Sequence, residues 1–157
     1  MKPNIGISET NLKRSTHLLS AMLANEMILY VKTRKSHWSV SGESFMELHK
    51  LFESQYNQLE LLIDEIAERI GKLGGKTIGT MNEFLKFSSI KEHPGKYLSS
   101  KDILNELLSD HEWIIIQLRK DIEECATKNK DAGTADFLTG LMEKHETTSW
   151  ILRRYIN

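Results

Sequence analysis

The distribution of proline is the feature of this sequence that most restricts its fold. The 157-residue chain contains only two prolines, Pro3 and Pro94, so long stretches carry no residue that would interrupt the hydrogen bonds of a helix. In these stretches apolar residues recur mostly at three- and four-residue steps, which is the period of an amphipathic α-helix. No segment shows the alternation of a β-strand. The sequence therefore predicts an all-α fold.

Four long helices are predicted from this periodicity, over about residues 8–35, 43–73 and 100–130, and from 131–134 to near the C-terminus. Ser44 and Glu47 have the spacing of a capping box at the start of the second helix. The connection over 76–100 is long for a hairpin loop and contains a short amphipathic segment, MNEFLKF. This order predicts a ferritin-like four-helix bundle with a short extra helix in a long crossover between helices 2 and 3. Residues 1–157 are expected to form one domain, with residues 1–8 flexible.

Composition and charge exclude several classes of protein. Charged residues make up 27% of the chain and apolar residues 39%, as in globular rather than disordered proteins. The net charge of -1 argues against a chain that binds nucleic acid through an overall basic surface. The single cysteine, Cys125, excludes an intrachain disulfide. No apolar run is long enough to span a membrane, and the first residues lack the apolar core of a signal peptide. We therefore expect a cytoplasmic protein without membrane association.

Residues 37–69 contain most of the candidate metal ligands. In the second predicted helix, His49 and Glu53 lie one turn apart, and so do Asp64 and Glu68. At about 100° per residue, all four fall within roughly a third of the helix circumference. The two pairs are about 15 residues apart, or roughly 22 Å along a helix, which is too far for one metal ion to bridge. Either these residues are ordinary surface charges, or each chain carries two half-sites that a second chain completes.

A two-fold axis would bring such half-sites together. We define the histidine half-site as His37, His49 and Glu53, with His37 just before the helix and able to fold back, and the acidic half-site as Asp64 and Glu68. If two copies of the helix pack antiparallel, the histidine half-site of one chain lies beside the acidic half-site of the other, and two identical sites result. Two imidazoles and three carboxylates suit Fe(II). The sequence contains no Glu-x-x-His motif, so a di-iron site within one chain is not expected.

The order of these residues resembles the Dps family, the mini-ferritins also named DNA-binding proteins from starved cells. The resemblance covers about Leu12 to Ile156. It is carried by HW at 37–38, GESFMELHKLFESQY at 42–56, DEIAER at 64–69, DAGTADFL at 131–138 and EKHETTSWILRRYI at 143–156. It implies a four-helix bundle that assembles as a hollow homo-dodecamer, with a ferroxidase centre at each two-fold interface.

The resemblance also implies the chemistry and the ligands. Each centre would hold two irons, with zinc as a further candidate for the resting site, and would oxidise Fe(II) to Fe(III), preferentially with hydrogen peroxide. Ferric mineral would be stored in the cavity, which protects against oxidative damage. One subunit would supply the histidine half-site and its partner the acidic half-site. Glu53 stands where the family shows either aspartate or glutamate, and the longer side chain can shift the second iron.

Three further residues are candidates for roles in this chemistry, Trp38 because of its position and two aspartates because the family has acidic pores. Trp38, next to His37, is a candidate relay that intercepts stray oxidising equivalents. A Trp38→Phe variant with unchanged radical leakage and unchanged iron kinetics would contradict that role. Asp131 and Asp136 are candidates for an acidic pore through which iron enters, and their alternative role is to cap the last helix and offset its dipole. His17, His111 and His145 are expected to be partly buried helix residues rather than ligands.

Other functions stay open at this point. The chain can instead be a structural cage or DNA-compacting particle with an impaired centre, or a helical adaptor whose charges are only surface charges. DNA binding is expected to be weak or absent, because few mobile positive charges flank the helices to contact phosphates. A salt-sensitive gel shift at physiological ionic strength would contradict this expectation.

Overall fold

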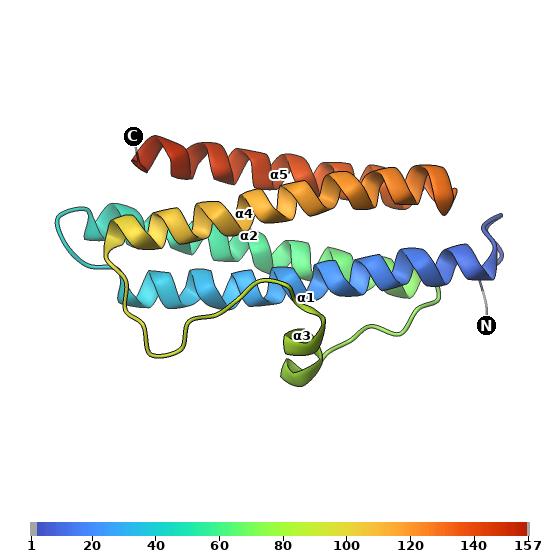
Figure 1. Ribbon diagram of the computed structural model, residues 1–157, viewed down its shortest axis with the longest axis horizontal. Helices are drawn as coiled ribbons and strands as arrows, with labels where there is room; N and C mark the ends of the chain where they lie inside the picture. Colours follow the sequence, from blue (N-terminus) through green and yellow to red (C-terminus); the bar gives the residue numbers. More distant parts are fainter. Residues whose placement is uncertain (1–2, 157) are drawn as a thin grey trace.

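The computed structural model describes residues 3–156 as an all-helical bundle (Figure 1). No strand occurs in this part of the chain, so the all-α prediction is confirmed. The elements are α1 (Glu9–Ser39), α2 (Phe45–Lys72), the short α3 (Met81–Phe87), α4 (Ser100–Glu123), the π-helical turn η1 (Glu124–Lys128) and α5 (Ala132–Ile156).

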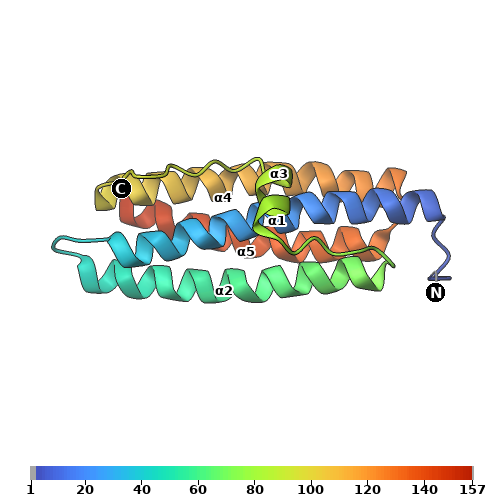
Figure 2. The same ribbon diagram turned by 90° about the horizontal axis from the view of Figure 1, so that it is seen from below.

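The four long helices form two antiparallel hairpins that pack face to face (Figures 1 and 2). The hairpins are α1 with α2 and α4 with α5. The crossover returns along the bundle before α4 begins, so α2 and α4 run in the same direction, and α3 packs against α1 on the way (Figure 1). This arrangement confirms the predicted topology, including the short helix in the crossover.

The core contains apolar side chains from all four long helices. Those with no exposed surface include Leu19, Leu29, Phe52, Ile66, Ile114, Leu118 and Leu152. Full burial of one such side chain contributes about 1.5–3 kcal/mol. Cys125 is also buried, and burial raises the pKa of its thiol to about 11, so the thiol stays protonated at neutral pH. No helix among the described residues is both long and apolar enough to cross a membrane.

The first helix continues four residues beyond its predicted end, to Ser39. The hydroxyl of Ser36 donates to the carbonyl of Lys32 at 2.9 Å, and that of Ser39 donates to Lys35 at 2.8 Å, so both serines fit within a helix. The chain leaves the helix at Val40, which is extended. His37 and Trp38 therefore lie in the last turn of α1 and not in a loop.

Two other boundaries differ from the predictions. Ser44 is the N-cap residue of α2, but its side chain accepts no capping hydrogen bond, so the predicted capping box with Glu47 is wrong. A capping box is instead present at α3, between Thr80 and Glu83. The third long helix was predicted to reach residue 130, but α4 ends at Glu123 and the π-helical turn follows.

Asp131 caps the start of α5. Its carboxylate accepts from the backbone N–H of Thr134 at 3.0 Å and from the Thr134 hydroxyl at 2.7 Å. Arg69 of α2 donates to the same hydroxyl at 3.0 Å and lies 3.4 Å from the Asp131 carboxylate. Asp131 is only 1% exposed, whereas the side chain of Arg69 is 24% exposed, so this cluster joins α2 to the start of α5 at the edge of the core.

Loss of this cap should destabilise the bundle. We expect Asp131→Ala to lower the free energy of unfolding by about 1–2 kcal/mol, because the first turn of α5 and the Arg69 guanidinium both lose an acceptor. The matched control is Asp136→Ala on the same helix, whose exposed side chain should change stability by less than about 0.5 kcal/mol. Denaturant unfolding at one protein concentration measures both. Equal effects would refute the capping role.

Candidate metal centre

The turn between α1 and α2 brings two predicted ligands together. His37, in the last turn of α1, and His49, in the first turns of α2, stack their rings with centroids 3.7 Å apart and an interplanar angle of 18°. His37 is 9% exposed, and His49 is half-buried. The fold-back of His37 towards the second helix is therefore present within one chain.

Reciprocal hydrogen bonds fix the orientation of both rings. Nδ1 of His37 lies 2.8 Å from the carbonyl oxygen of His49, and Nδ1 of His49 lies 2.8 Å from the carbonyl oxygen of His37. A carbonyl oxygen only accepts, so each Nδ1 must carry a proton. In the neutral imidazoles the lone pair is then on Nε2. A metal-binding histidine needs this arrangement, with one nitrogen held by the protein and the other free to ligate.

Aromatic side chains surround the stacked pair. The ring of Tyr56 meets His37 edge to face at 5.2 Å, and the ring of Phe45 lies 5.0 Å from His49. The guanidinium of Arg34 lies 4.3 Å from the Tyr56 ring and 5.5 Å from the Trp38 ring. Trp38 is 66% exposed and packs against Arg34, so its proposed relay role stays a prediction.

The carboxylates of both half-sites lie on the outer side of α2. Glu53, Asp64 and Glu68 are all exposed, and Glu68 accepts a hydrogen bond from Lys72 at 2.9 Å. The opposite side of the helix is buried in the core through Leu48, Phe52, Gln55, Tyr56, Leu59, Leu62, Ile66 and Ile70. The carboxylates are therefore available to a neighbouring molecule.

One chain does not assemble these ligands into a single site. Within residues 3–156, no three histidine, cysteine, aspartate or glutamate side chains are arranged to hold a metal ion. The structure joins His37 to His49 with Glu53 one turn further along α2, while the acidic half-site lies nearer the other end of that helix. The ligand assignment stays a prediction that requires a second subunit.

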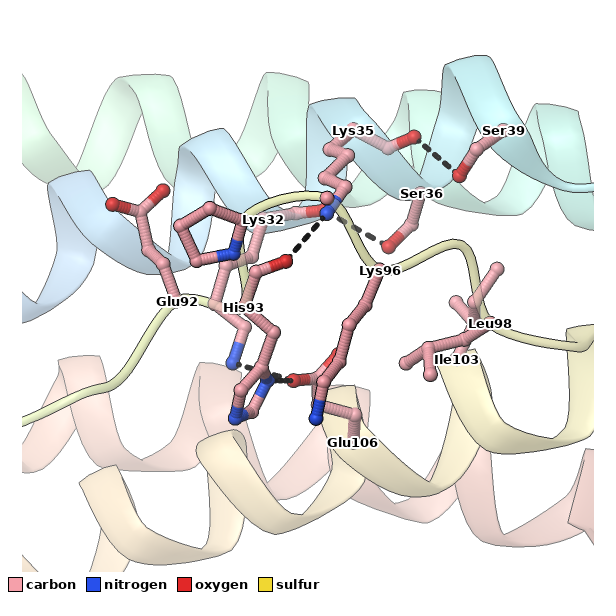
Figure 3. A pocket seen from close by; sticks show the side chains of 12 residues that line it. Lys32, Lys35, Ser36, Ser39, Glu92, His93, Lys96, Leu98, Ile103 and Glu106 are labelled. Atoms are coloured by element: carbon pink, nitrogen blue, oxygen red, sulfur yellow. Dashed lines mark hydrogen bonds and ion pairs between the residues drawn. The ribbon is translucent and has the colours of Figure 1, made fainter.

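A cavity of about 310 Å³ lies on the other side of α1, beneath the crossover (Figure 3). Figure 3 shows Lys32 and His93 directed at Glu106, at 3.2 and 2.6 Å. Burial alone would raise the pKa of Glu106, but Lys32 and His93 outweigh burial and hold that pKa below its usual value. None of the five predicted ligands lines this cavity, so it is separate from the candidate centre.

The two predicted pore residues have different environments. Asp131 is buried and serves as the cap of α5, so the alternative role considered from the sequence accounts for it. Asp136 is exposed one turn into α5 and makes no such hydrogen bond. A pore assignment therefore depends mainly on Asp136.

Comparisons with known proteins agree with this architecture. The model of the ferritin-like domain family matches residues 16–157. A low temperature-induced protein of Nostoc is 44% identical over 98% of this chain and 86% of its own length. DNA protection during starvation protein 2 of Bacillus anthracis is 35% identical over 92% of this chain and 98% of its own length.

A solved structure with a similar fold is that of a Dps protein from Vibrio cholerae O1, a member of a broad superfamily of ferritin-like diiron-carboxylate proteins. It is 30% identical and superposes with a TM-score of 0.92 over 99% of this chain and 97% of its own. The Dps protein of Thermosynechococcus elongatus is 32% identical, with a TM-score of 0.89 over 94% of this chain and 93% of its own.

The histidine geometry can be tested without any metal. In ¹⁵N-histidine-labelled, metal-free protein at a pH where the imidazoles are neutral, we expect His37 and His49 to carry their proton on Nδ1. The ¹⁵N shifts should place the unprotonated nitrogen at Nε2. The exposed His17, which makes no such hydrogen bond to a carbonyl, serves as the reference. A predominant Nε2–H tautomer at either position would contradict the arrangement.

Proposed function

We propose that this chain, which belongs to the ferritin-like family and to its Dps branch, oxidises Fe(II) at centres completed by two subunits and stores the ferric product inside a hollow dodecamer. Family membership supports a general role in iron storage and protection. The observation that carries the specific proposal is the locked histidine pair, which leaves two Nε2 lone pairs near the outer side of α2.

The spacing of the carboxylates supports completion by a second copy. In an antiparallel two-fold contact, one register places His49 opposite Glu68, and the same register places Glu53 opposite Asp64, because both pairs have the same midpoint on α2. Leu61, close to that midpoint, is 66% exposed. An exposed apolar side chain between the half-sites is what a self-complementary contact would bury.

The chemistry follows from the electron count. Two Fe(II) ions held close together each give one electron, and hydrogen peroxide takes both electrons with two protons to form two molecules of water. Hydroxyl radical is therefore not released. The imidazoles bind Fe(II), and the carboxylates stabilise the harder Fe(III) product. The protein supplies position and charge, and Glu53 has the oxygen donors that this role needs.

Fe(II) oxidation measured together with particle size tests this proposal. After anaerobic loading with Fe(II) and addition of hydrogen peroxide, we expect rapid formation of Fe(III) that co-elutes with a particle of about twelve subunits. Glu68→Gln should slow the oxidation by at least about tenfold, because it removes the charge of a ligand. Glu65→Gln is the matched control, since Glu65 is exposed on the same helix and lies outside both half-sites.

The result also separates the proposal from its alternative. If the wild-type particle is intact but oxidises Fe(II) no faster than buffer does, the centre is impaired and the structural-cage function is favoured. If the protein is a monomer, the helical adaptor is favoured instead.

We assign iron entry to Asp136, because the carboxylate of Asp131 is already used to cap the start of α5. We expect Asp136→Asn to slow iron uptake at low ionic strength and to have a much smaller effect at high salt, because attraction of a cation by a surface carboxylate is screened within about a Debye length. Initial uptake rates at two ionic strengths measure this difference. Unchanged uptake at low ionic strength would show that Asp136 does not line the entry path.

A further inference from the structure

Four polar side chains, one from each long helix, are almost completely buried inside the bundle. They are Glu26 of α1, Gln55 of α2, His111 of α4 and His145 of α5, with exposed fractions of 0%, 4%, 1% and 1%. A buried charge is costly unless it is paired. None of the four belongs to the proposed iron centre, so the cluster needs its own explanation.

Three of these side chains form a continuous chain of contacts. Nε2 of His145 lies 2.8 Å from Oε1 of Glu26, although it is not well aligned for a hydrogen bond. Nδ1 of His145 lies 2.8 Å from Nδ1 of His111. At the far end, Nε2 of His111 has no hydrogen-bond partner, and neither does the amide of Gln55, which lines the same small gap.

The contacts restrict how many protons the three residues hold. One proton must lie between the two Nδ1 atoms, because two lone pairs would otherwise face each other. A second must lie between His145 and Glu26 for the same reason. With only these two protons, the imidazoles are neutral, the carboxylate is ionised and the buried unit has a net charge of -1. One more proton makes the unit neutral, which burial favours. With this proton on Nε2 of His111 and the proton between the two Nδ1 atoms on His145, His111 is neutral and His145 is charged beside Glu26.

We propose that Glu26, His145 and His111 form an acid-sensitive contact between α1, α4 and α5, which we call the latch. At neutral pH the latch holds one proton more than its two contacts require, so its net charge is zero. When acid adds a further proton, the latch becomes charged and the packing of α1 against α4 and α5 weakens. The side chains of the latch come from α1, α4 and α5, so its protonation state affects the stability of the packing between the two hairpins. It does not depend on the proposed iron chemistry.

The direction of the pH effect follows from His111. Burial, and then the nearby charge of His145, hold the pKa of His111 well below its usual value of 6.5. In the unfolded chain this histidine takes up a proton as the pH falls below about 6.5, whereas in the folded chain it resists doing so. The unfolded state then binds more protons than the folded state, so stability falls on acidification.

Among residues 3–156, the charged side chains near His111 other than His145 are already paired with other groups. From α2 the neighbouring side chains Gln55 and Gln58 are uncharged. From α5, Lys144 lines the same gap and is paired with Glu65 at 3.4 Å. From α1 the facing charge is Glu26, already beside His145. The adjacent Asp110 of α4 is paired with Lys32 of α1.

The test is the pH dependence of unfolding for the wild type, His111→Gln and His17→Gln, in metal-free protein at one fixed subunit concentration. Glutamine at 111 can still accept from His145 but cannot titrate. Between about pH 6.5 and 5, the unfolding constant of the wild type should rise up to about tenfold more per pH unit than that of His111→Gln. His17→Gln, an exposed control, should follow the wild type. The same pH dependence in His111→Gln and wild type would overturn the latch.

A second measurement applies even if His111→Gln does not fold. In ¹⁵N-histidine-labelled wild type at pH 7, the three residues should hold one proton more than the two that their contacts require, with His111 neutral and His145 protonated on both nitrogens. A net-negative unit with both imidazoles neutral, or a charged His111, would overturn the proposal. So would stoichiometric binding of Zn²⁺ that shifts the His111 and His145 resonances in a His49→Ala, Glu68→Gln variant, because the cluster would then be a metal site.

Discussion

Burial of one side of α2 is the constraint on which the functional account depends. Phe52, Ile66 and Ile70 have no exposed surface, so the rotation of the helix about its own axis is fixed by the core. With that rotation fixed, the carboxylates of Glu53, Asp64 and Glu68 point out of the bundle. The packing of one chain thus determines which side chains can reach a second chain. A metal centre built from them would therefore require assembly of two subunits in addition to folding.

The sequence predicts those features of the fold that depend on the spacing of apolar and polar residues along a single helix. The apolar stripe of α2, the two-by-two grouping of its polar residues and the short helix MNEFLKF follow from spacing along one helix. The predicted helix stops at residue 35, four residues before the end of α1, whereas the hydroxyls of Ser36 and Ser39 donate to carbonyls within the helix. The boundary matters, since it places His37 on a rigid element.

Contacts between residues that are far apart in the chain could not be predicted from the sequence. The tautomers of His37 and His49 depend on two backbone carbonyls that meet only when α1 and α2 pack. The sequence nominates Asp131 for the pore with capping as the alternative, and the capping role follows only from its burial and its hydrogen bond to the backbone of Thr134. The sequence predicts that His17, His111 and His145 are partly buried. The prediction is wrong for His17, which is exposed, while His111 and His145 are almost completely buried. His145 contacts both His111 and Glu26, and Glu26 carries no sequence signal of its own.

Complementation between two inactive variants tests most directly whether each centre is shared by two subunits. His49→Ala inactivates the histidine half-site, and Glu68→Gln inactivates the acidic half-site. In a mixed dimer one centre carries both changes and the other carries neither. Random co-assembly should therefore restore about a quarter of the wild-type centres, and a corresponding share of the peroxide-dependent Fe(II) oxidation. If the mixed particles stay as inactive as either parent, the ligands act within one chain and the account is wrong.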